Sequence, residues 1–317
     1  MRNGLVAVVA LVALSATACG QTGDEGDWRR PAHAGRTATA AVSHPGAPAS
    51  ALSAPREARS PAELAARLTT AERVSRDPSS ARPVAAQAGF EAQVLYRQLA
   101  GRPRWMRPVV GAVPVALRAT VRLHIRARRA FRTMHHTLSR TLPSWRIVAP
   151  ASEPALLAFY REGERRFGVP WQVLAAVNLV ETGMGRIRGT SVAGARGPMQ
   201  FMPGTWAAYG RGDIDDPHDA ILAAARYLAH NGGGRGKIDQ ALFAYNRSRL
   251  YVRGVEAYAA ILHASPAALR GLYDWQVVYL SRRGDVWLPV GYARTSPAGT
   301  SAYLRRHPER LLSRSTR

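Results

Sequence analysis

An apolar segment that ends on a single acid, Val169 to Gly183, limits the possible folds of this chain more than any other. Valine and leucine recur in it every three or four residues, which is the spacing of a buried helix. Pro170 suits the first turn of a helix, and Gly183 is a typical residue after the last one. Glu181 therefore falls in the last turn. The helix dipole and apolar neighbours both disfavour its ionised form, so we expect a carboxyl group that stays protonated near neutral pH, as a general acid requires.

Helical signals continue on both sides of this segment. Ser152 before Pro154 is a typical helix start, and so is Asp216 before Pro217. Counting the acid-bearing segment, the spacing of apolar residues predicts helices over 153–167, 169–182, 220–230, 238–246 and 251–263. The predicted fold class is therefore mainly α, with a compact helical domain at residues 152–264.

A glycine-rich connection follows the acid and leads into apolar and aromatic residues. Met199, Phe201 and Trp206 offer surface on which a ligand can stack, and Gln200 offers both a donor and an acceptor. The helical spacing of Phe201 and Trp206 is equally compatible with a place in the core. We take this connection as the candidate ligand-binding surface.

Three short motifs in this region together resemble those of lytic murein transglycosylases, whose catalytic domain is similar to goose-type lysozyme. They are Glu181-Thr-Gly, Gly197-Pro-Met-Gln-Phe-Met-Pro-Gly-Thr205 and Ala244-Tyr-Asn246. The resemblance covers about residues 153–263. One glycine-rich motif would be weak evidence, whereas three in this order, with a helix that ends on the acid, are strong evidence in combination.

The resemblance implies an activity and a set of site residues. In the family, the acid cleaves the β-1,4 bond between N-acetylmuramic acid and N-acetylglucosamine of peptidoglycan and leaves a 1,6-anhydro ring. No cofactor and no metal are implied. The matching residues are the catalytic Glu181, the nearby Ser191, the groove residues Met199, Gln200 and Phe201, and the pair Tyr245 and Asn246 across the cleft.

A single carboxyl group is enough for this chemistry. A classical retaining glycosidase needs two, about 5–5.5 Å apart. In a transglycosylase, Glu181 first protonates the leaving oxygen and then, as a carboxylate, deprotonates the C6 hydroxyl of the sugar, which attacks C1. Two alternatives are open: a hydrolytic muramidase of the same fold, and a non-catalytic lipoprotein that binds the cell wall. The acids that a muramidase could use as a base, or that simply start a helix, are Asp213, Asp215, Asp216 and Asp219.

The N-terminal residues resemble a bacterial lipoprotein signal. A basic start and an apolar run from Leu5 to Leu14 precede Cys19, the only cysteine of the chain. We predict a signal peptide over 1–19, with Cys19 as the lipidation site, and an exported protein anchored to the outer face of the cytoplasmic membrane. An ordinary cleaved signal is the alternative. Residues 20–90 are rich in Ala, Pro, Ser and Gly and are predicted to be a disordered linker, with a possible short helix at Pro61–Arg76.

Residues 91–151 are predicted to form an arginine-rich helical segment. No acid occurs between 92 and 152, and twelve arginines lie between 97 and 146. From Val115 to Met134 the pattern is helical, and Arg118, Arg122, Arg126, Arg129 and Arg132 form one stripe. The stripe is either a solvated face packed on the catalytic domain or a contact with anionic membrane or wall polymers. Nucleic acid is not expected, because no nucleic-acid-binding motif is present.

The C-terminal extension, residues 265–317, has no predicted function beyond packing on the catalytic domain. The pattern continues helically to about Arg282. The apolar stretch 285–290 contains Pro289, so it is predicted to be at best an edge strand.

Overall fold

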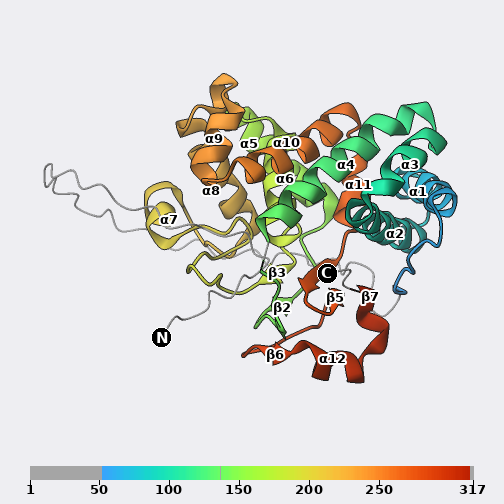
Figure 1. Cartoon of the computed structure of the whole chain (residues 1–317). Coiled ribbons are helices and arrows are strands. Elements are labelled where there is room, and N and C mark those ends of the chain that lie inside the picture. The colour runs from blue at the N-terminus through green and yellow to red at the C-terminus, as the bar shows by residue number, and fades with distance from the viewer. Residues whose placement is uncertain (1–51, 136, 315–317) are drawn as a thin grey trace, which may run out of the picture.

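The computed structural model of the chain describes residues 52–135 and 137–314, and its fold is mainly α-helical, as the sequence predicts. The helices form a broad layer, and the few short strands gather beneath it (Figure 1). The predicted signal peptide, Cys19 and residues 20–51 lie outside the described residues. None of the helices in the described ranges is both long enough and apolar enough to cross a membrane.

The prediction of a disordered linker is wrong for residues 52–90. The prediction rests on an alanine-rich composition, which is common in linkers. Alanine is also the best helix former, and its small side chain lets helices pack closely. Ser60 caps the first helix by accepting a hydrogen bond from the backbone N–H of Glu63, and Leu64 and Leu68 are fully buried. The elements up to residue 134 are α1 (Pro61–Arg76), α2 (Arg82–Gly101), the 3-10 helix η2 (Pro103–Trp105), α3 (Met106–Ala112) and α4 (Val115–Met134). The predicted helices at 61–76 and 115–134 are therefore confirmed.

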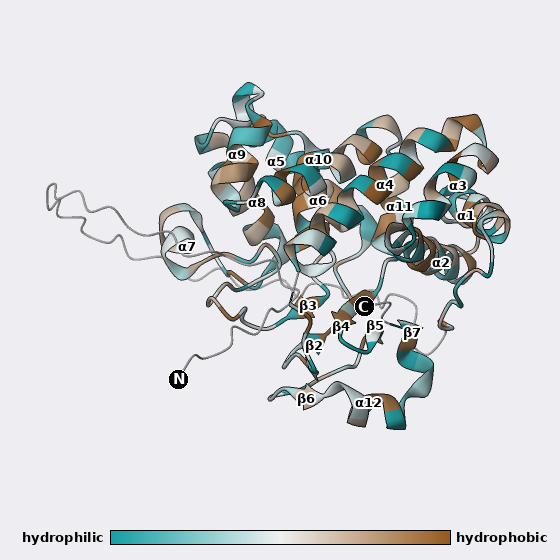
Figure 2. Ribbon diagram, in the orientation of Figure 1, coloured by the Kyte–Doolittle hydropathy of each residue, from teal (hydrophilic) through white to brown (hydrophobic). Residues whose placement is uncertain are grey.

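The arginine-rich helix α4 is part of the folded body. It packs along α10 (Arg249–Ala264), and a Cβ on Gly254 would lie 2.3 Å from the ring of Phe131, so the two helices touch closely there. Figure 2 shows hydrophobic and hydrophilic residues alternating along α4. Its buried residues include Val121 and Ile125, while the exposed arginines of the predicted stripe are Arg122, Arg126 and Arg129.

The central helical domain follows the sequence prediction closely. The side chain of Ser152 accepts from the N–H of Ala155, and that of Asp216 accepts from the N–H of Asp219, so both predicted helix starts are confirmed. Pro170 precedes its helix as the cap residue instead of lying inside the first turn. The elements from residue 141 to the end of this domain are β1 (Thr141–Leu142) and β2 (Arg146–Ile147), which precede it, and then α5 (Glu153–Phe167), α6 (Trp171–Thr182), β3 (Ile187–Arg188), α7 (Pro203–Tyr209), α8 (Pro217–His230), η3 (Gly233–Arg235), α9 (Ile238–Tyr245) and α10.

The C-terminal part differs from the prediction. The helical pattern stops at Tyr273, and a three-stranded antiparallel sheet follows in the order β4-β5-β7. The strand predicted to be an edge is the central one, because it ends at Leu288, one residue before the proline that cannot donate a ladder hydrogen bond. The elements are α11 (Ala268–Tyr273), β4 (Val277–Ser281), β5 (Gly284–Leu288), β6 (Ala298–Gly299), α12 (Thr300–Arg306), η4 (Pro308–Arg310) and β7 (Leu311–Arg314).

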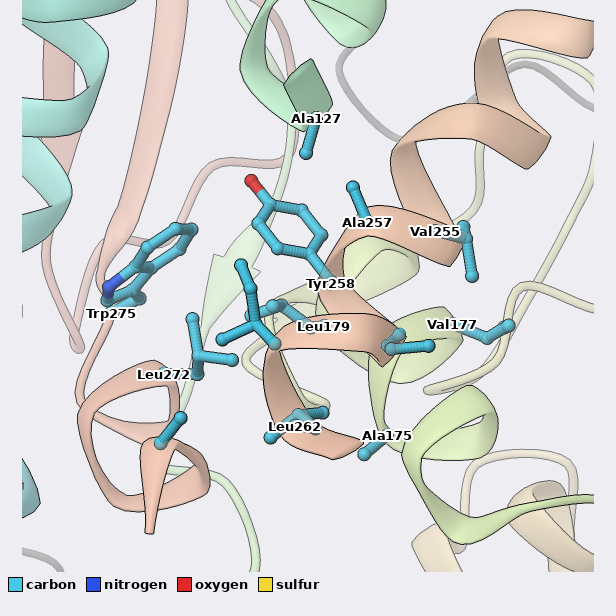
Figure 3. Packing of buried hydrophobic residues seen from close by; sticks show 14 of the residues in the cluster. Ala127, Ala175, Val177, Leu179, Val255, Ala257, Tyr258, Leu262, Leu272 and Trp275 are labelled. Atoms are coloured by element: carbon cyan, nitrogen blue, oxygen red, sulfur yellow. The ribbon is translucent and has the colours of Figure 1, made fainter. Parts of the chain in front are cut away.

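One continuous core joins the N-terminal helices to the central domain. Ala127 of α4, Leu179 of α6 and Tyr258 of α10 meet in it (Figure 3). Two short strand pairs add further links: β1 pairs with β6, and β2 pairs with β3, which lies in the glycine-rich connection after Glu181. The glycine-rich connection is therefore held from outside the central domain.

Candidate active site

Glu181 lies in the last turn of α6, as predicted, and its side chain is only 3% exposed. Gly183 ends the helix with φ 62°, a left-handed conformation that glycine adopts without strain. The buried side chain of Arg186 donates to the carbonyls of Gly183 (3.1 Å) and Tyr273 (2.6 Å), so it ties the end of α6 to α11. These contacts hold the acid-bearing turn in one place.

The environment of Glu181 keeps its carboxyl group protonated. Burial raises the pKa of Glu181 to about 8, and a hydrogen bond from Tyr251 opposes part of this rise. The Tyr251 hydroxyl donates to Glu181 Oε1 at 2.8 Å. Because a folded-state pKa near 8 lies above neutral pH, the carboxyl group is mainly neutral at pH 7 and can donate its proton.

Tyr251 is a site residue that the sequence analysis missed. It lies in the first turn of α10, where its backbone N–H donates to the capping hydroxyl of Ser248. Little in the sequence indicates this role. Ser248 marks the start of a helix, but a capping serine does not reveal that the tyrosine three residues later contacts Glu181, 70 residues away in the chain. The position of the cap fixes which residue of α10 reaches the acid.

The second motif is attached to the helix that carries the acid. The carbonyl of Pro198 accepts hydrogen bonds from Asn178 Nδ2 (3.0 Å) and Thr182 Oγ1 (2.6 Å). Asn178 is itself oriented by the hydroxyl of Tyr160, which donates to its Oδ1 at 2.7 Å. All three side chains are buried, so these hydrogen bonds fix the loop to α6.

Gln200 and Ser191 shape the loop around the motif. Gln200 has φ 52°, an uncommon value for a non-glycine residue, and its Nε2 donates to the Gly197 carbonyl at 3.1 Å. Its Oε1 is buried and has no hydrogen-bond partner among the described residues. Ser191 Oγ accepts from the N–H of Ala195 at 2.9 Å, so its contact lies within its own loop. Gln200 thus retains an unused acceptor.

Tyr245 joins the second motif to the third. Its hydroxyl donates to the carbonyl of Met199 at 2.6 Å, and its ring lies parallel to that of Tyr251, with 6.5 Å between centroids. Burial raises the pKa of Tyr245, and the charge of Glu181 raises it further, which places the two groups in the same environment. Phe201 contacts Tyr245 edge-on at 6.2 Å. Of the other predicted residues, Met199 is fully buried and Asn246, which follows α9, is 6% exposed.

The acidic residues between 213 and 219 make hydrogen bonds at the start of α8. Asp216 caps that helix, and Asp219 Oδ2 accepts from the N–H of Asp213. Within residues 52–135 and 137–314, one group of side chains has the spacing of metal ligands: Asp216, His218 and Asp219. His218 also contacts Glu162 at 3.0 Å. The charges that act on the pKa of Glu181 include none of these acids.

One of three comparisons with known proteins gave a match. Residues 159–264 match the family model described as the transglycosylase SLT domain, a range that contains all three motifs and runs from α5 to the end of α10. Searches of curated proteins and of solved structures each gave no match. The match supports a peptidoglycan-cleaving activity of the transglycosylase type. The resemblance to lytic transglycosylases is therefore confirmed over this range, and residues 159–264 form a transglycosylase SLT domain with a lysozyme-like helical fold.

Proposed function

We propose that this chain cleaves the β-1,4 bond between N-acetylmuramic acid and N-acetylglucosamine in peptidoglycan and leaves 1,6-anhydro-muramyl ends, with Glu181 as the single general acid and base. The observation that carries the proposal is the buried carboxyl group of Glu181, whose pKa is raised to about 8. A neutral carboxyl group at pH 7 can protonate the leaving glycosidic oxygen.

The reaction needs no second carboxylate. Glu181 gives its proton to the leaving oxygen and becomes a carboxylate, while positive charge develops at C1. The carboxylate then removes the proton of the C6 hydroxyl, whose oxygen forms the new bond to C1, and Glu181 is neutral again. In the described ranges, only burial and the Tyr251 hydroxyl act on the pKa of Glu181, and this isolation from other acids supports one residue in both roles.

We assign the glycan groove to the second and third motifs. Gln200 Oε1, which is buried and has no partner among the described residues, has the chemistry to accept from a hydroxyl or acetamido N–H of a sugar that displaces its cover. Tyr251 is added as a positioning residue, because its hydroxyl holds Glu181 Oε1. The proposed substrate-binding residues are Ser191, Met199, Gln200, Phe201, Tyr245 and Asn246.

Mass spectrometry of digested peptidoglycan tests this proposal. We expect the purified chain to release fragments with 1,6-anhydro ends, because the C6 hydroxyl and not water attacks C1. Reducing ends would instead indicate the hydrolytic muramidase, with one of the acids at 213–219 as its base. Intact glycan after incubation with well-folded protein would indicate the non-catalytic wall-binding lipoprotein.

We propose further that the protein is exported and held at the outer face of the cytoplasmic membrane. Cys19 would carry the lipid, and residues 97–146 would contact anionic lipid or wall polymers. The exposed Arg122, Arg126 and Arg129 support this contact, since each basic residue near an anionic surface contributes about 1 kcal/mol. Metabolic labelling with a fatty acid checks the anchor: we expect label on the wild type and none on Cys19→Ser, and a labelled variant would refute the assignment.

A further inference from the structure

A cavity of about 140 Å³ lies where three parts of the chain meet. Its walls come from α2 and α4, from α6 and α10 of the SLT domain, and from the C-terminal sheet. Leu179 and Gly183 line it, each two residues from Glu181 along the chain. At 3.6 residues per turn these positions lie on the side of α6 opposite to the acid. The cavity is therefore separate from the proposed glycan site.

The charges around this cavity do not balance. Arg97 and Arg128 line it together with one carboxylate, Asp285, which pairs with Arg97. Arg97 engages both oxygens of Asp285, with Nε–Oδ2 2.6 Å and Nη2–Oδ1 2.5 Å. Arg128 makes no ion pair within residues 52–135 and 137–314, and burial followed by the charge of Arg97 lowers its pKa. A partly buried guanidinium without its own counter-charge favours binding of an anion.

A buried hydroxyl group adds a second donor. Tyr258 is 2% exposed and lines the cavity, and its hydroxyl has no hydrogen-bond partner of normal geometry among the described residues. Figure 3 shows this ring between Ala127 and Trp275, with the hydroxyl directed toward α4. Burial raises the pKa of Tyr258, and the charge of Arg128 together with a hydrogen bond from its guanidinium to the Tyr258 oxygen opposes the rise, so the two groups share one environment. The guanidinium can only donate, so the O–H of Tyr258 still lacks an acceptor, and a buried donor without an acceptor costs free energy that a bound carboxylate would recover.

The aromatic lining of the remaining walls favours an organic anion over an inorganic one. Phe131, Trp145 and Trp275 give the cavity an aromatic lining, which phosphate or sulfate would leave unused. The volume of about 140 Å³ exceeds the roughly 10–15 Å³ that one water needs on the same measure, so the cavity can hold a small molecule. One unpaired guanidinium corresponds to one negative charge. We propose that this cavity binds a small organic carboxylate, such as the carboxyl end of a short peptide, with Arg128 and Tyr258 donating to the carboxylate and the aromatic walls holding the apolar part.

Calorimetric titration of the full chain tests the proposal with three probes: N-acetyl-D-alanyl-D-alanine, N-acetyl-L-alanyl-L-alanine and inorganic phosphate. We expect one dipeptide to bind per chain and to bind more tightly than phosphate. Arg128→Gln is expected to weaken dipeptide binding by about tenfold or more, because it removes a charge-assisted hydrogen bond. Tyr258→Phe removes only the hydroxyl and should weaken binding several-fold. Arg253→Gln, a change of an exposed arginine on the helix that carries Tyr258, should leave it unchanged.

The arms of this experiment separate the possible results. A preference for the D-dipeptide assigns the site to a peptidoglycan stem, and equal binding or an L preference assigns it to peptide ends in general. Undiminished binding by well-folded Tyr258→Phe and Arg128→Gln, absence of saturable dipeptide binding, or phosphate binding as tight as dipeptide binding would each overturn the proposal. The readout is binding, not cleavage, at a cavity on the other side of α6 from Glu181, so its failure is distinct from a failure of the proposed cleavage.

Discussion

Replacing Glu181 with glutamine is expected to abolish glycan cleavage, with a loss in kcat/KM of at least 10²–10⁴-fold, about the contribution of general acid–base catalysis. The amide fills the same buried space and can still accept the hydrogen bond of Tyr251, but it has no proton to donate at neutral pH. Release of anhydro fragments, followed by mass spectrometry, measures the effect. Activity close to wild type would remove Glu181 as the acid.

The same substitution is expected to change how stability depends on pH. The pKa of Glu181 rises from 4.5 to about 8 on folding, so the folded state binds the proton more tightly than the unfolded state. Wild-type stability therefore falls as pH rises from about 4.5 to 8, by on the order of 3 kcal/mol at pH 7. Glu181→Gln lacks this loss, so its stability relative to wild type should increase over that window. Urea unfolding across this pH range measures the difference.

The pH dependence of cleavage, in wild type and in two further variants, tests whether ionisation of Glu181 causes these effects. Cleavage by wild type should fall as pH rises through about 8, when Glu181 loses its proton. Tyr251→Phe removes a hydrogen bond that lowers the pKa of Glu181, so the alkaline limb of its pH profile should move upward. Glu309→Gln, a change of an exposed acid, should alter neither the profile nor the slope of stability with pH. A stability difference between Glu181→Gln and wild type that stays constant with pH would contradict the assigned protonation state.

The second large effect is expected at the buried ion pair between α2 and β5. The side chains of Arg97 and Asp285 are only 8% and 7% exposed. Asp285→Ala would leave Arg97 without its carboxylate beside two further arginines, Arg128 and Arg132. Removal of one partner of a buried pair costs about 3–5 kcal/mol. We expect a decrease of this size in the free energy of unfolding, measured by denaturant titration at pH 7.

An exposed pair provides the control for this effect. Asp239 lies 3.8 Å from Arg249, and both side chains are more than 60% exposed, so Asp239→Ala should cost about 0–1 kcal/mol. Burial alone would raise the pKa of Asp285, but Arg97 lowers it below its usual 3.8. The stability from this pair is therefore present above about pH 4 and is lost as pH falls through the folded pKa. Equal losses for the two variants would show that the buried pair contributes no more than a surface contact.

The local features of the fold could be predicted from the sequence because their causes are local. The helix from Val115 to Met134 follows from its apolar spacing. Ser152 and Asp216 start helices because the side-chain oxygen of each accepts a hydrogen bond from the backbone N–H three residues later, which would otherwise have no partner. The end of α6 follows from Gly183, and the three motifs predicted the SLT domain that the family match supports.

Other features depend on neighbours that are far apart in the chain. Tyr251 reaches Glu181 across 70 residues, and Arg97 meets Asp285 across 188. Residues 61–90 have a composition typical of linkers, and they are ordered because other helices cover their small apolar faces.

The sequence by itself determined where the main helices of the central domain lie and which residue is the candidate acid. Only the tertiary structure decided how strongly that acid holds its proton, which hydroxyl contacts it and where the arginines of the basic segment lie. The physical reason is that capping and periodicity act within one or two turns. Burial, which sets both the pKa of Glu181 and the environment of Arg128, exists only after distant elements have packed together.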